Sequence, residues 1–566
     1  MKIVVVGGVA GGMSAAARAR RLAEDAEIVV FERGEHPSFA NCGLPYFVGG
    51  EIADEDALLV QTPDSLREAL DLDVRVRHEV TAVDPRAKTV TVRSPEGEDQ
   101  VTYDALILSP GARAITPPIP GIDADCVTTL RTVGDAVALR ERVFNGAHRA
   151  VVLGAGFIGL EAAEALRLQG LTVDVVELAD HVLPPLEPEI AAVIRDQLVA
   201  MGIRVHDGVA ATAIQTGQPQ APAIVEIADG TAISADVVVL SVGVTPDTAP
   251  FESAGIACER GAIIVDEHGR TNLDSIWAVG DATVSTDAVT GLRRPVALAG
   301  PANRAGRQVA DAILRPATAR PIPAPVGTAI VRIGTLTAAL TGANRRSLDS
   351  AGISYETIHL HPGSHAGYFP GAEQIHLLMH LRTTDGLILG AQAVGADGVD
   401  KRIDVIATAI RAQMTATDLI DLDLAYAPPY GSAKDPVNMA GMIGDNVING
   451  DPTLWQADTV GTTMQNALIL DVRSANEFAD GHIGGALLVP HNEIRDRIDE
   501  IRSAAAGRPI RVYCQSGMRS YLATRVLAAA GFDVAHLSGG MATLLARLGD
   551  EASQYLTEPD LEPAVV

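Results

Sequence analysis

Short apolar runs alternate with amphipathic stretches along much of the chain. Strands are predicted at Lys2–Val6 and Glu27–Phe31, with a helical pattern between them. The same order returns at Ala150–Leu153 and Leu171–Val176, and a third time from the strand Ala467–Leu470. Repeated strand–helix–strand units are typical of α/β domains built on parallel sheets. We therefore expect an α/β fold in which this unit is used three times.

Further apolar segments complete the first two units. Tyr103–Gly111 (YDALILSPG) is predicted to be a buried strand that ends in a Pro-Gly turn, and Val237–Gly243 (VVVLSVG) to close the second unit. Thr271–Asp281 holds a short apolar strand followed by Gly280 and Asp281. A carboxylate at that position could accept hydrogen bonds from the hydroxyl groups of a cofactor.

The pattern changes after these units. Four prolines between Arg315 and Val326 predict a domain junction. Residues 327–445 then mix short strands with one amphipathic helix, expected at about Gly398–Met414. Residues 446–464 are expected to form an irregular linker, and the acidic stretch Asp550–Val566 a frayed tail.

Composition narrows the possible functions. A chain of 566 residues is long enough for three to five domains. A net charge of −27 argues against nucleic-acid binding, because a basic face supplies the affinity there. The four scattered cysteines predict neither a disulfide framework nor a metal site, which fits a reducing cytoplasm. We expect no signal peptide and no membrane-spanning segment.

The turn after the first strand reads GGVAGG. Gly7 and Gly12 match the outer glycines of the dinucleotide-binding fingerprint, and Val9 replaces the middle one. The following helix is expected to run to about Glu24. This unit is predicted to place a pyrophosphate at the helix N-terminus and a ribose against Glu32, where the second strand ends.

The second turn, GAGFIG, carries the complete fingerprint. Gly154, Gly156 and Gly159 are all present, and Glu177 follows at the end of the next strand. Its carboxylate is expected to bind ribose hydroxyls and to repel a 2′-phosphate. The site therefore favours NADH over NADPH.

Cys42 lies in the stretch SFANCGLPY, ten residues after Glu32. Its loop can reach back to the reactive ring of a bound cofactor. No second cysteine is close enough in sequence to form a CxxC pair, so a redox cycle at Cys42 would take its other sulfur from a substrate. The alternative is a buried structural cysteine that packs as a small hydrophobic residue.

Ser14, Arg18 and Arg21 share one face of the first helix, because their spacing is i, i+4 and i+7. Two arginines near an acceptor thiol could bind a phosphorylated thiol. A solvated basic face is the alternative interpretation.

A second reactive cysteine is predicted near the C-terminus. The strand Ile510–Tyr513 leads into the loop CQSGMRS, which begins at Cys514 and enters a helix. Backbone N–H groups of such a loop, together with Arg519, would stabilise a thiolate or persulfide anion. Cys126 and Cys258 are expected to be inert.

Several motifs together resemble a known family. Besides SFANCGLPY, these are GAGFIGLE, AVGDA, ALAGPANRAGR and YAPPYGSAKDP. By these motifs, residues 1 to about 445 resemble the flavin-dependent pyridine nucleotide-disulfide oxidoreductases, and within them the coenzyme A-disulfide reductases. The C-terminal region resembles a single-domain rhodanese. One departure is the segment Glu68–Leu72, which lacks the basic residue that the family often carries there.

The resemblance implies a domain order. An FAD-binding domain would comprise residues 1–117 and 246–323, interrupted by an NAD(P)H-binding domain at 118–245. A dimerisation domain of mixed α and β structure would follow at 327–445, then the linker at 446–464, a rhodanese domain at 465–550 and the acidic tail at 551–566. The resemblance also implies a homodimer, in which Tyr368 and Tyr426 enter the active site of the partner subunit.

Site residues are carried over by the same resemblance. Catalytic roles are expected for Cys42, Cys514, Tyr368, Tyr426 and Arg519. Cofactor contacts are expected at Gly7, Val9, Ala10, Gly11, Gly12, Glu32, Arg33, Val80, Ser109, Gly111, Gly154, Gly156, Phe157, Ile158, Gly159, Glu161, Glu177, Gly243, Gly280, Asp281, Ala297, Leu298 and Ala299. Substrate contacts are expected at Ser14, Arg18, Arg21, Ser38, Asn41, Asn303, Arg307 and Lys434.

These features together predict an FAD-dependent enzyme that uses NADH to reduce coenzyme A disulfide, coenzyme A persulfide or polysulfide at Cys42. The rhodanese domain would handle sulfane sulfur, and NADPH is a possible second donor. Two alternatives remain open. One is an NADH oxidase or peroxidase that uses a cysteine sulfenic acid, and the other is a non-catalytic redox sensor or sulfur carrier.

Overall fold

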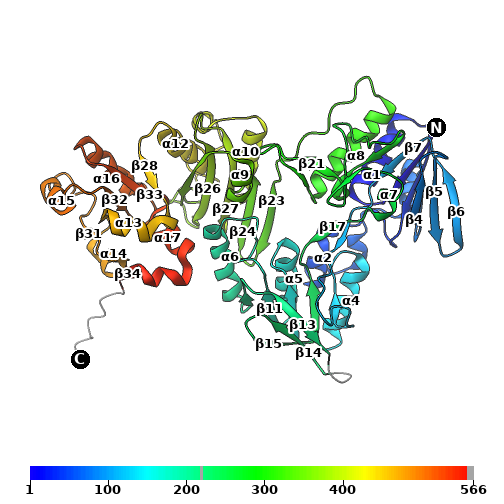
Figure 1. The fold of residues 1–566 in the computed structure, drawn as a ribbon, viewed down its shortest axis with the longest axis horizontal. Coiled ribbons are helices and arrows are strands. Elements are labelled where there is room, and N and C mark those ends of the chain that lie inside the picture. Colours follow the sequence, from blue (N-terminus) through cyan, green and yellow to red (C-terminus); the bar gives the residue numbers. More distant parts are fainter. Residues whose placement is uncertain (217–220, 558–566) are drawn as a thin grey trace. The chain divides into compact units, whose positions relative to one another are not determined.

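The computed structural model describes residues 1–216 and 221–557. These residues form two compact units. The first contains residues 1–180 and 198–327, and the second contains residues 181–197 and the chain from 328 onward. Figure 1 shows the helices and strands of both units.

The first unit begins with a parallel five-stranded sheet in the order β20-β7-β1-β2-β3. Helices α1 (Ala10–Leu22) and α8 (Ala299–Leu314) pack against each other beside it. The strands are β1 (Lys2–Val6), β2 (Glu27–Glu32), β3 (Asp73–Val76), β7 (Ala105–Leu108) and β20 (Ile276–Ala278). The predicted strands and first helix are confirmed, and the helix ends two residues before Glu24.

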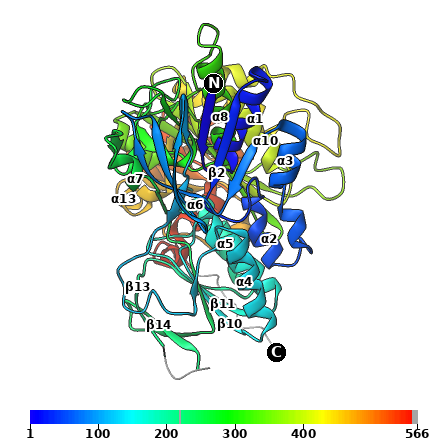
Figure 2. The same cartoon turned by 90° about the vertical axis from the view of Figure 1, so that its right-hand side faces the viewer.

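A second parallel sheet interrupts the first one along the chain, in the order β12-β11-β10-β16-β9. Its strands are β9 (Val127–Thr128), β10 (Arg149–Leu153), β11 (Thr172–Val176), β12 (Arg204–His206) and β16 (Val237–Leu240). Helix α2 (Leu44–Val48) contacts both α4 (Val133–Phe144) and α5 (Phe157–Leu168), as Figure 2 shows. This unit also contains two three-stranded antiparallel sheets, besides smaller two-stranded ones. The first is formed by β4 (Glu79–Asp84), β5 (Thr89–Ser94) and β6 (Gly97–Thr102), and the second by β13 (Ala211–Gln215), β14 (Ala223–Ile227) and β15 (Ala232–Ala235).

The second unit contains an antiparallel sheet in the order β23-β24-β27-β26-β25. The strands are β23 (Ala329–Ile333), β24 (Leu336–Gly342), β25 (Tyr355–Leu360), β26 (Ile375–Arg382) and β27 (Ile388–Gly395). The expected amphipathic helix is α10 (Val399–Arg411). The expectation of a single helix is wrong, because α9 (Arg345–Ala351), α11 (Ala416–Ile420) and α12 (Pro436–Ile448) also form, each begun by a capping side chain.

A parallel sheet in the order β28-β33-β32-β29-β31 follows in the same unit. Its strands are β28 (Thr453–Trp455), β29 (Leu468–Asp471), β31 (Leu487–Leu488), β32 (Ile510–Tyr513) and β33 (Val534–Leu537). The helices include α13 (Val460–Asn466), α14 (Ala475–Ala479), α15 (Ile498–Ala505), α16 (Met518–Ala529) and α17 (Gly540–Leu548).

Two expectations about this region are wrong. Residues 446–464 are not irregular, because they contain the end of α12, the edge strand β28 and the start of α13. Trp455 anchors β28: it is 6% exposed, and its indole N–H donates to the carbonyl of Val512 at 3.3 Å. The start of the acidic tail is also ordered, since β34 (Leu556–Thr557) pairs with β30 (His482–Ile483). Residues 558–566 lie outside the described residues.

The described parts of the chain contain no helix with both the length and the apolar character that a bilayer crossing requires. Within the same residues, His, Cys, Asp and Glu do not form a group of three or more that could hold a metal ion.

Candidate active site

The first glycine turn forms a tight cradle between β1 and α1. A Cβ atom on Gly12 would lie 2.0 Å from the carbonyl oxygen of Gly7, so only glycine permits this approach. The carboxylate of Glu32 accepts hydrogen bonds from the N–H groups of Gly8 and Gly34, both at 2.7 Å. The sequence-predicted glycines and acid therefore lie together, in the arrangement that binds a dinucleotide.

A hollow adjoins this cradle and brings in two more of the expected cofactor contacts, Arg33 and Val80. It is lined by Gly7, Glu32, Arg33, Val80, Phe251 and several neighbours. Apolar and polar lining of this kind suits an adenosine group. Asp247, which was not predicted, also lines the hollow and forms an ion pair with Arg33.

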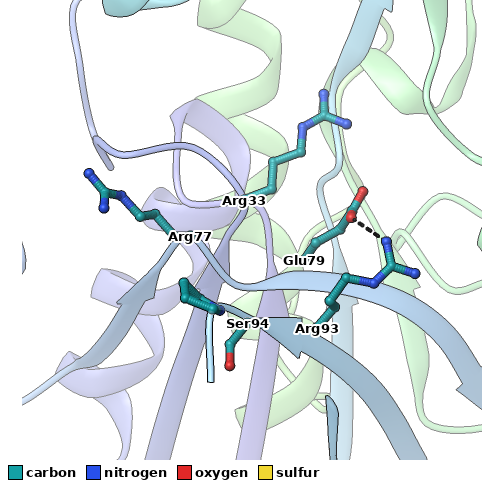
Figure 3. A pocket seen from close by; sticks show the side chains of 6 residues that line it. Arg33, Arg77, Glu79, Arg93 and Ser94 are labelled. Atoms are coloured by element: carbon teal, nitrogen blue, oxygen red, sulfur yellow. Dashed lines mark hydrogen bonds and ion pairs between the residues drawn. The ribbon is translucent and has the colours of Figure 1, made fainter. Parts of the chain in front are cut away.

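A second, more open hollow lies between Arg33 and the hairpin of β4 and β5 (Figure 3). Each of its arginines is paired with a carboxylate: Arg33 with Asp247, Arg77 with Glu35, and Arg93 with Glu79. Its positive charge is therefore balanced by the protein itself, and we assign no ligand to it.

The acid that was predicted near the cofactor, Asp281, is partly buried and has a counter-ion. Burial raises the pKa of the Asp281 carboxyl, and the positive charge of Arg131 opposes that rise. Arg131 also holds the loop of Cys42, since its carbonyl accepts a hydrogen bond from the Asn41 side chain at 3.0 Å. Arg131 was not predicted, because it lies 89 positions after Cys42 (131 − 42) and only the fold brings the two regions together.

The second glycine turn repeats the geometry of the first. A Cβ atom on Gly159 would lie 2.0 Å from the carbonyl oxygen of Gly154. The carboxylate of Glu177 accepts hydrogen bonds from the N–H groups of Ala155 at 2.6 Å and Ala179 at 2.8 Å. This unit therefore forms a second dinucleotide cradle, as its complete fingerprint predicts.

Cys42 lies in a short 3-10 helix, Asn41–Gly43, between the two cradles along the chain. Its side chain is exposed to solvent and forms no disulfide. The pKa of the Cys42 thiol is nevertheless raised, first by removal of surrounding water and then by the negative charge of Glu161. The thiol is therefore protonated near neutral pH. It would ionise more readily if a positively charged or electron-withdrawing group lay beside the sulfur.

Glu161 ties the cysteine loop to the second cradle. It lies on α5, and its carboxylate accepts a hydrogen bond from the Tyr46 hydroxyl at 3.1 Å. Tyr46 lies on α2, the helix that begins at Leu44, just after Cys42. Helix α2 contacts both α4 and α5. Cys42 is therefore held where elements of the two nucleotide-binding folds meet.

The expected substrate contacts on α1 and α8 lie side by side. Ser14 donates a hydrogen bond to the side-chain oxygen of Asn303 at 3.0 Å. Arg21 is exposed and bonds the carbonyl of Ala17 at 2.9 Å. Arg18 forms an ion pair with Asp311 at 2.6 Å, so its charge is already partnered within the protein.

The remaining expected contacts divide between the two units. Ser38 and Asn41 lie in the Cys42 loop, and the N–H of Ser38 donates to the carbonyl of Gly8 at 2.8 Å. Arg307 is exposed on α8. Lys434, in contrast, lies in the second unit, together with the two expected tyrosines.

Those tyrosines, Tyr368 and Tyr426, touch each other. Their hydroxyl oxygens are 2.8 Å apart, and this hydrogen bond raises the pKa of Tyr368. Both side chains are exposed, by 76% and 48%, so the pair can meet another molecule. The buried ion pair of Arg402 and Asp435 steadies their loops, because Arg402 also donates to the carbonyl of Ser364 at 2.8 Å.

Cys514 lies at the end of β32 and is 1% exposed. Its sulfur accepts a hydrogen bond from the N–H of Gly517 at 3.1 Å and lies 3.4 Å from the hydroxyl oxygen of Ser520. The thiol donates to Ser520, whose own hydroxyl donates to the carbonyl of Gly517 at 2.9 Å, so the backbone N–H of Gly517 is the donor to the sulfur that an anion-binding loop would provide. The predicted strand, loop and helix are confirmed.

Arg519 is shared between the cysteine and a carboxylate. It forms two hydrogen bonds with Glu477, at 2.7 and 2.5 Å, and these lower the pKa of Glu477 to about 2. The sulfur of Cys514 in turn contributes to raising the pKa of Arg519. Glu477 was not predicted, because its role depends on contact between α14 and α16.

Comparisons with known proteins agree with this geometry. Residues 1–306 match the family described as pyridine nucleotide-disulphide oxidoreductase, and residues 328–436 match its dimerisation domain. Residues 457–546 match the rhodanese-like domain. The chain is 35% identical to the coenzyme A disulfide reductase of Staphylococcus haemolyticus over 446 residues, which is 78% of this chain and 98% of that relative.

Two solved structures resemble nearly the whole chain. Reduced CoADR-RHD from Bacillus anthracis has a TM-score of 0.94 at 41% identity, covering 97% of this chain and 98% of that one. An NAD-dependent persulfide reductase from A. fulgidus has a TM-score of 0.88 at 37% identity, covering 96% and 100%.

Proposed function

Because the chain belongs to the pyridine nucleotide-disulphide oxidoreductase family, we propose that it is an FAD-dependent enzyme that uses NADH to reduce sulfur–sulfur bonds at Cys42. Its substrates would be coenzyme A disulfide and persulfides of coenzyme A or related thiols. The printed names of its relatives support this substrate class.

One observation carries the proposal. A solvent-exposed single cysteine is anchored, through Tyr46 and Glu161, where two dinucleotide cradles meet. The glycine turn, Glu32 and the adjoining hollow suit the adenosine half of FAD, and the turn with Glu177 suits NADH. Bound flavin supplies the chemistry that converts a hydride from NADH into two electrons for sulfur.

Cys42 performs the sulfur chemistry. With a disulfide, its thiolate attacks one sulfur, the other leaves as a thiolate that takes up a proton, and a mixed disulfide remains on Cys42. With a persulfide, Cys42 takes the sulfane sulfur and releases the carrier thiol, and two electrons and two protons then convert that sulfur to hydrogen sulfide. Ser14, Arg21 and Asn303 are proposed to orient a phosphorylated thiol beside Cys42.

We further propose that the active enzyme is a homodimer, since residues 328–436 match a dimerisation domain. The exposed pair of Tyr368 and Tyr426 would enter the partner's active site, where a hydroxyl could protonate the departing thiolate. Lys434 follows Tyr426 closely in sequence and would contact the same substrate.

The rhodanese-like domain supports sulfane sulfur as the cargo. Cys514 lies in an anion-binding loop, so it would hold a persulfide and raise the local supply of sulfane sulfur for Cys42. The acidic Glu177 in the NAD cradle would make NADH the preferred donor and NADPH a poor one.

Steady-state rates without oxygen test the proposal. We expect NADH oxidation with coenzyme A disulfide or coenzyme A persulfide, and its loss in Cys42→Ser by a factor of at least about 10³, because no other residue can hold the substrate sulfur. The variant should still bind FAD and accept hydride from NADH.

Three outcomes would contradict the proposal. Substrate reduction by Cys42→Ser at near the wild-type rate would remove Cys42 from the reaction. Oxygen consumption that matches NADH oxidation, without any dependence on sulfur substrates, would favour an oxidase. Absence of any turnover by the FAD-loaded wild type would favour a sensor or sulfur carrier.

A further inference from the structure

The segment that follows β33, residues 538–542, consists of a two-residue turn and the first residues of α17; it is called the loop 538–542 below and supports the Cys514 loop directly. The N–H of Met541 donates to the carbonyl of Cys514 at 2.8 Å, and the N–H of Ala542 donates to the carbonyl of Gln515 at 3.0 Å. These two hydrogen bonds hold the backbone of Cys514 and Gln515 in place, and with it the position of the Cys514 sulfur.

The opposite side of the same loop is bound to strand β25 of the antiparallel sheet. The hydroxyl oxygen of Ser538 accepts a hydrogen bond from the backbone N–H of His359 at 3.1 Å and lies 2.8 Å from its ring Nδ1. One turn of helix later, Thr543 is bonded to the ring of His361 at 2.9 Å. The loop therefore joins the Cys514 region to β25.

Two glycines make this close contact possible. A Cβ atom on Gly539 would lie 2.7 Å from the Cβ of His359 and 1.9 Å from the Thr543 hydroxyl oxygen. A Cβ atom on Gly540 would lie 2.4 Å from the carbonyl oxygen of Cys514. His359 packs against Gly539, and Gly540 packs against the Cys514 carbonyl. Because these contacts leave no free space, a displacement of His359 would also displace the Cys514 backbone.

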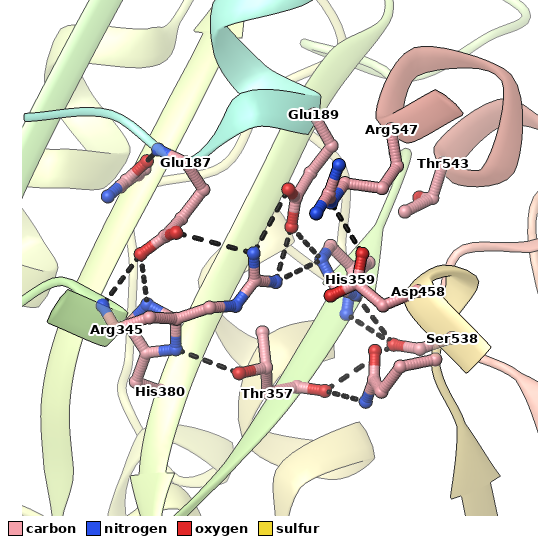
Figure 4. Close-up of polar contacts among 12 residues, drawn as sticks. Glu187, Glu189, Arg345, Thr357, His359, His380, Asp458, Ser538, Thr543 and Arg547 are labelled. Atoms are coloured by element: carbon pink, nitrogen blue, oxygen red, sulfur yellow. Dashed lines mark hydrogen bonds and ion pairs between the residues drawn. The ribbon is translucent and has the colours of Figure 1, made fainter. Parts of the chain in front are cut away.

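His359 is itself fixed from behind by Glu189 of helix α6 (Pro188–Ala200). Its Nε2 lies 2.8 Å from the Glu189 carboxylate, which also binds the guanidinium of Arg345 (Figure 4). Glu187 adds a second carboxylate, which receives hydrogen bonds from Arg345 and lies 3.3 Å from the His380 ring. The imidazole of His359 thus has a carboxylate on one nitrogen and the Ser538 hydroxyl on the other.

Serine, histidine and glutamate in this order could suggest a hydrolytic triad, but the bonds of Ser538 differ from those of a nucleophile. Ser538 is 2% exposed, His359 is 7% exposed and Glu189 is 4% exposed. The Ser538 hydroxyl also accepts a hydrogen bond from the backbone N–H of His359 and lies 3.5 Å from the carbonyl oxygen of Thr357, so the protein itself uses its hydrogen-bonding capacity. The chain of hydrogen bonds must therefore act by holding structure in place.

We infer that His359 is a positioning residue for sulfur transfer at Cys514, acting through Ser538 and the loop 538–542. This inference rests on the proposed sulfur-transfer function of Cys514. In that function the Cys514 thiolate takes the outer sulfur of thiosulfate and releases sulfite, and the resulting persulfide passes its sulfur to cyanide to give thiocyanate. His359 neither touches the substrate nor exchanges a proton with it.

The test measures thiocyanate formation and the reactivity of Cys514 in the full-length protein. In His359→Ala and Ser538→Ala we expect kcat to fall about tenfold, with KM for thiosulfate changed less than twofold. The pH profile of iodoacetamide labelling, followed by mass spectrometry of the Cys514 peptide, should shift in both variants. His359→Asn, which keeps a hydrogen-bonding atom near the Nδ1 position, should recover part of the loss.

Gln456→Ala is the matched control. Its side-chain N–H donates to the carbonyl of Thr357 on the same strand at 2.9 Å, and its loss leaves both bonds between Ser538 and His359 in place. We expect this variant to stay within twofold of wild type in both measurements. NADH-dependent disulfide reduction should stay within twofold in all of the variants.

Four results would decide the matter. Wild-type sulfur transfer and labelling in His359→Ala and Ser538→Ala would overturn the inference. Equal losses in Gln456→Ala would also overturn it, because general contact with β25 would then be responsible. If His359→Ala does not fold, Ser538→Ala, which removes only one hydroxyl, decides alone. Unchanged thiocyanate formation in Cys514→Ser would instead show that the proposed function of Cys514 is wrong.

Discussion

At the scale of single residues, the chemistry depends on charges placed next to sulfur. Cys42 has a carboxylate, Glu161, among its neighbours, and this charge opposes formation of the thiolate. Cys514 has backbone and hydroxyl groups around its sulfur and a guanidinium close by. The two cysteines are therefore in opposite electrostatic settings.

Replacing Glu161 with Gln should lower the pKa of Cys42. The substitution removes a negative charge that raises this pKa, so more thiolate is present at any pH below it. Iodoacetamide labelling of the Cys42 peptide at pH 7 should become several-fold faster. Tyr46→Phe removes the hydrogen bond and keeps the charge, so it should leave the rate near that of wild type. Slower labelling in Glu161→Gln would contradict the electrostatic explanation.

Glu177 should set the choice between nicotinamide nucleotides. Its carboxylate is held by two backbone N–H groups where a ribose is expected, so a 2′-phosphate would meet a fixed like charge. We expect kcat/KM for NADH to exceed that for NADPH by at least about tenfold, equivalent to ~1.4 kcal/mol. Glu177→Ala should narrow the ratio, mainly by improving NADPH. Equal use of both nucleotides by wild type would show that Glu177 does not control the choice.

At the scale of elements, the sequence predicted those whose apolar pattern is uninterrupted. Strands β1, β10 and β32 begin or end within one residue of expectation, since each is a run of apolar residues bounded by turn residues. Strand β28 was missed because it is only three residues long, too short to show a strand pattern, and a single buried side chain, Trp455, holds it in the sheet.

The candidate site was predictable to a similar extent. Both glycine turns and both reactive cysteines lie in continuous motifs, which sequence alone can identify. Arg131, Asp311 and Glu477 could not be predicted, because each is defined by a contact between elements distant in the chain. The ion pair of Arg18 with Asp311 is an example, since spacing placed Arg18 on one helix face with Ser14 and Arg21 but could not reveal Asp311 as its partner.

Trp455→Ala should destabilise the rhodanese-like domain selectively. Truncating a buried tryptophan to alanine lowers the free energy of unfolding by about 3–5 kcal/mol. The variant also loses the hydrogen bond from the indole N–H to the carbonyl of Val512. Sulfurtransferase activity should then be lost at lower urea concentration than in wild type. Trp277, the other of the two tryptophans, lies on β20 of the first unit, so its fluorescence transition should not move. A smaller loss in Trp455→Phe, and none in the Trp277 signal, would distinguish local from global unfolding.

At the scale of the whole molecule, two sulfur sites lie on different units. Cys42 belongs to the first unit and Cys514 to the second. Each has its own supporting loop, so the two reactions should be separable by mutation.

Cys514→Ser should strongly lower sulfur transfer from thiosulfate, by about 10²-fold or more, because the thiolate is the nucleophile. Reduction of a soluble disulfide by NADH should stay near normal in the same preparation, with flavin content checked. Loss of coenzyme A disulfide reduction while FAD remains bound would contradict this division. Cys514 would then belong to the redox reaction itself.

The placement of helix α6 has a consequence for how this gene can be divided. Residues 181–197 fold with the second unit, although they are encoded between segments of the first. A fragment that starts at residue 328 would lack Glu187 and Glu189, and Arg345 and the buried His380 would lose their carboxylate partners. The complementary fragment would carry two acids that are buried in the whole protein. Recombination or cloning at the apparent domain border should therefore yield two poorly folding products, which ties the inheritance of the C-terminal half to that of the nucleotide-binding half.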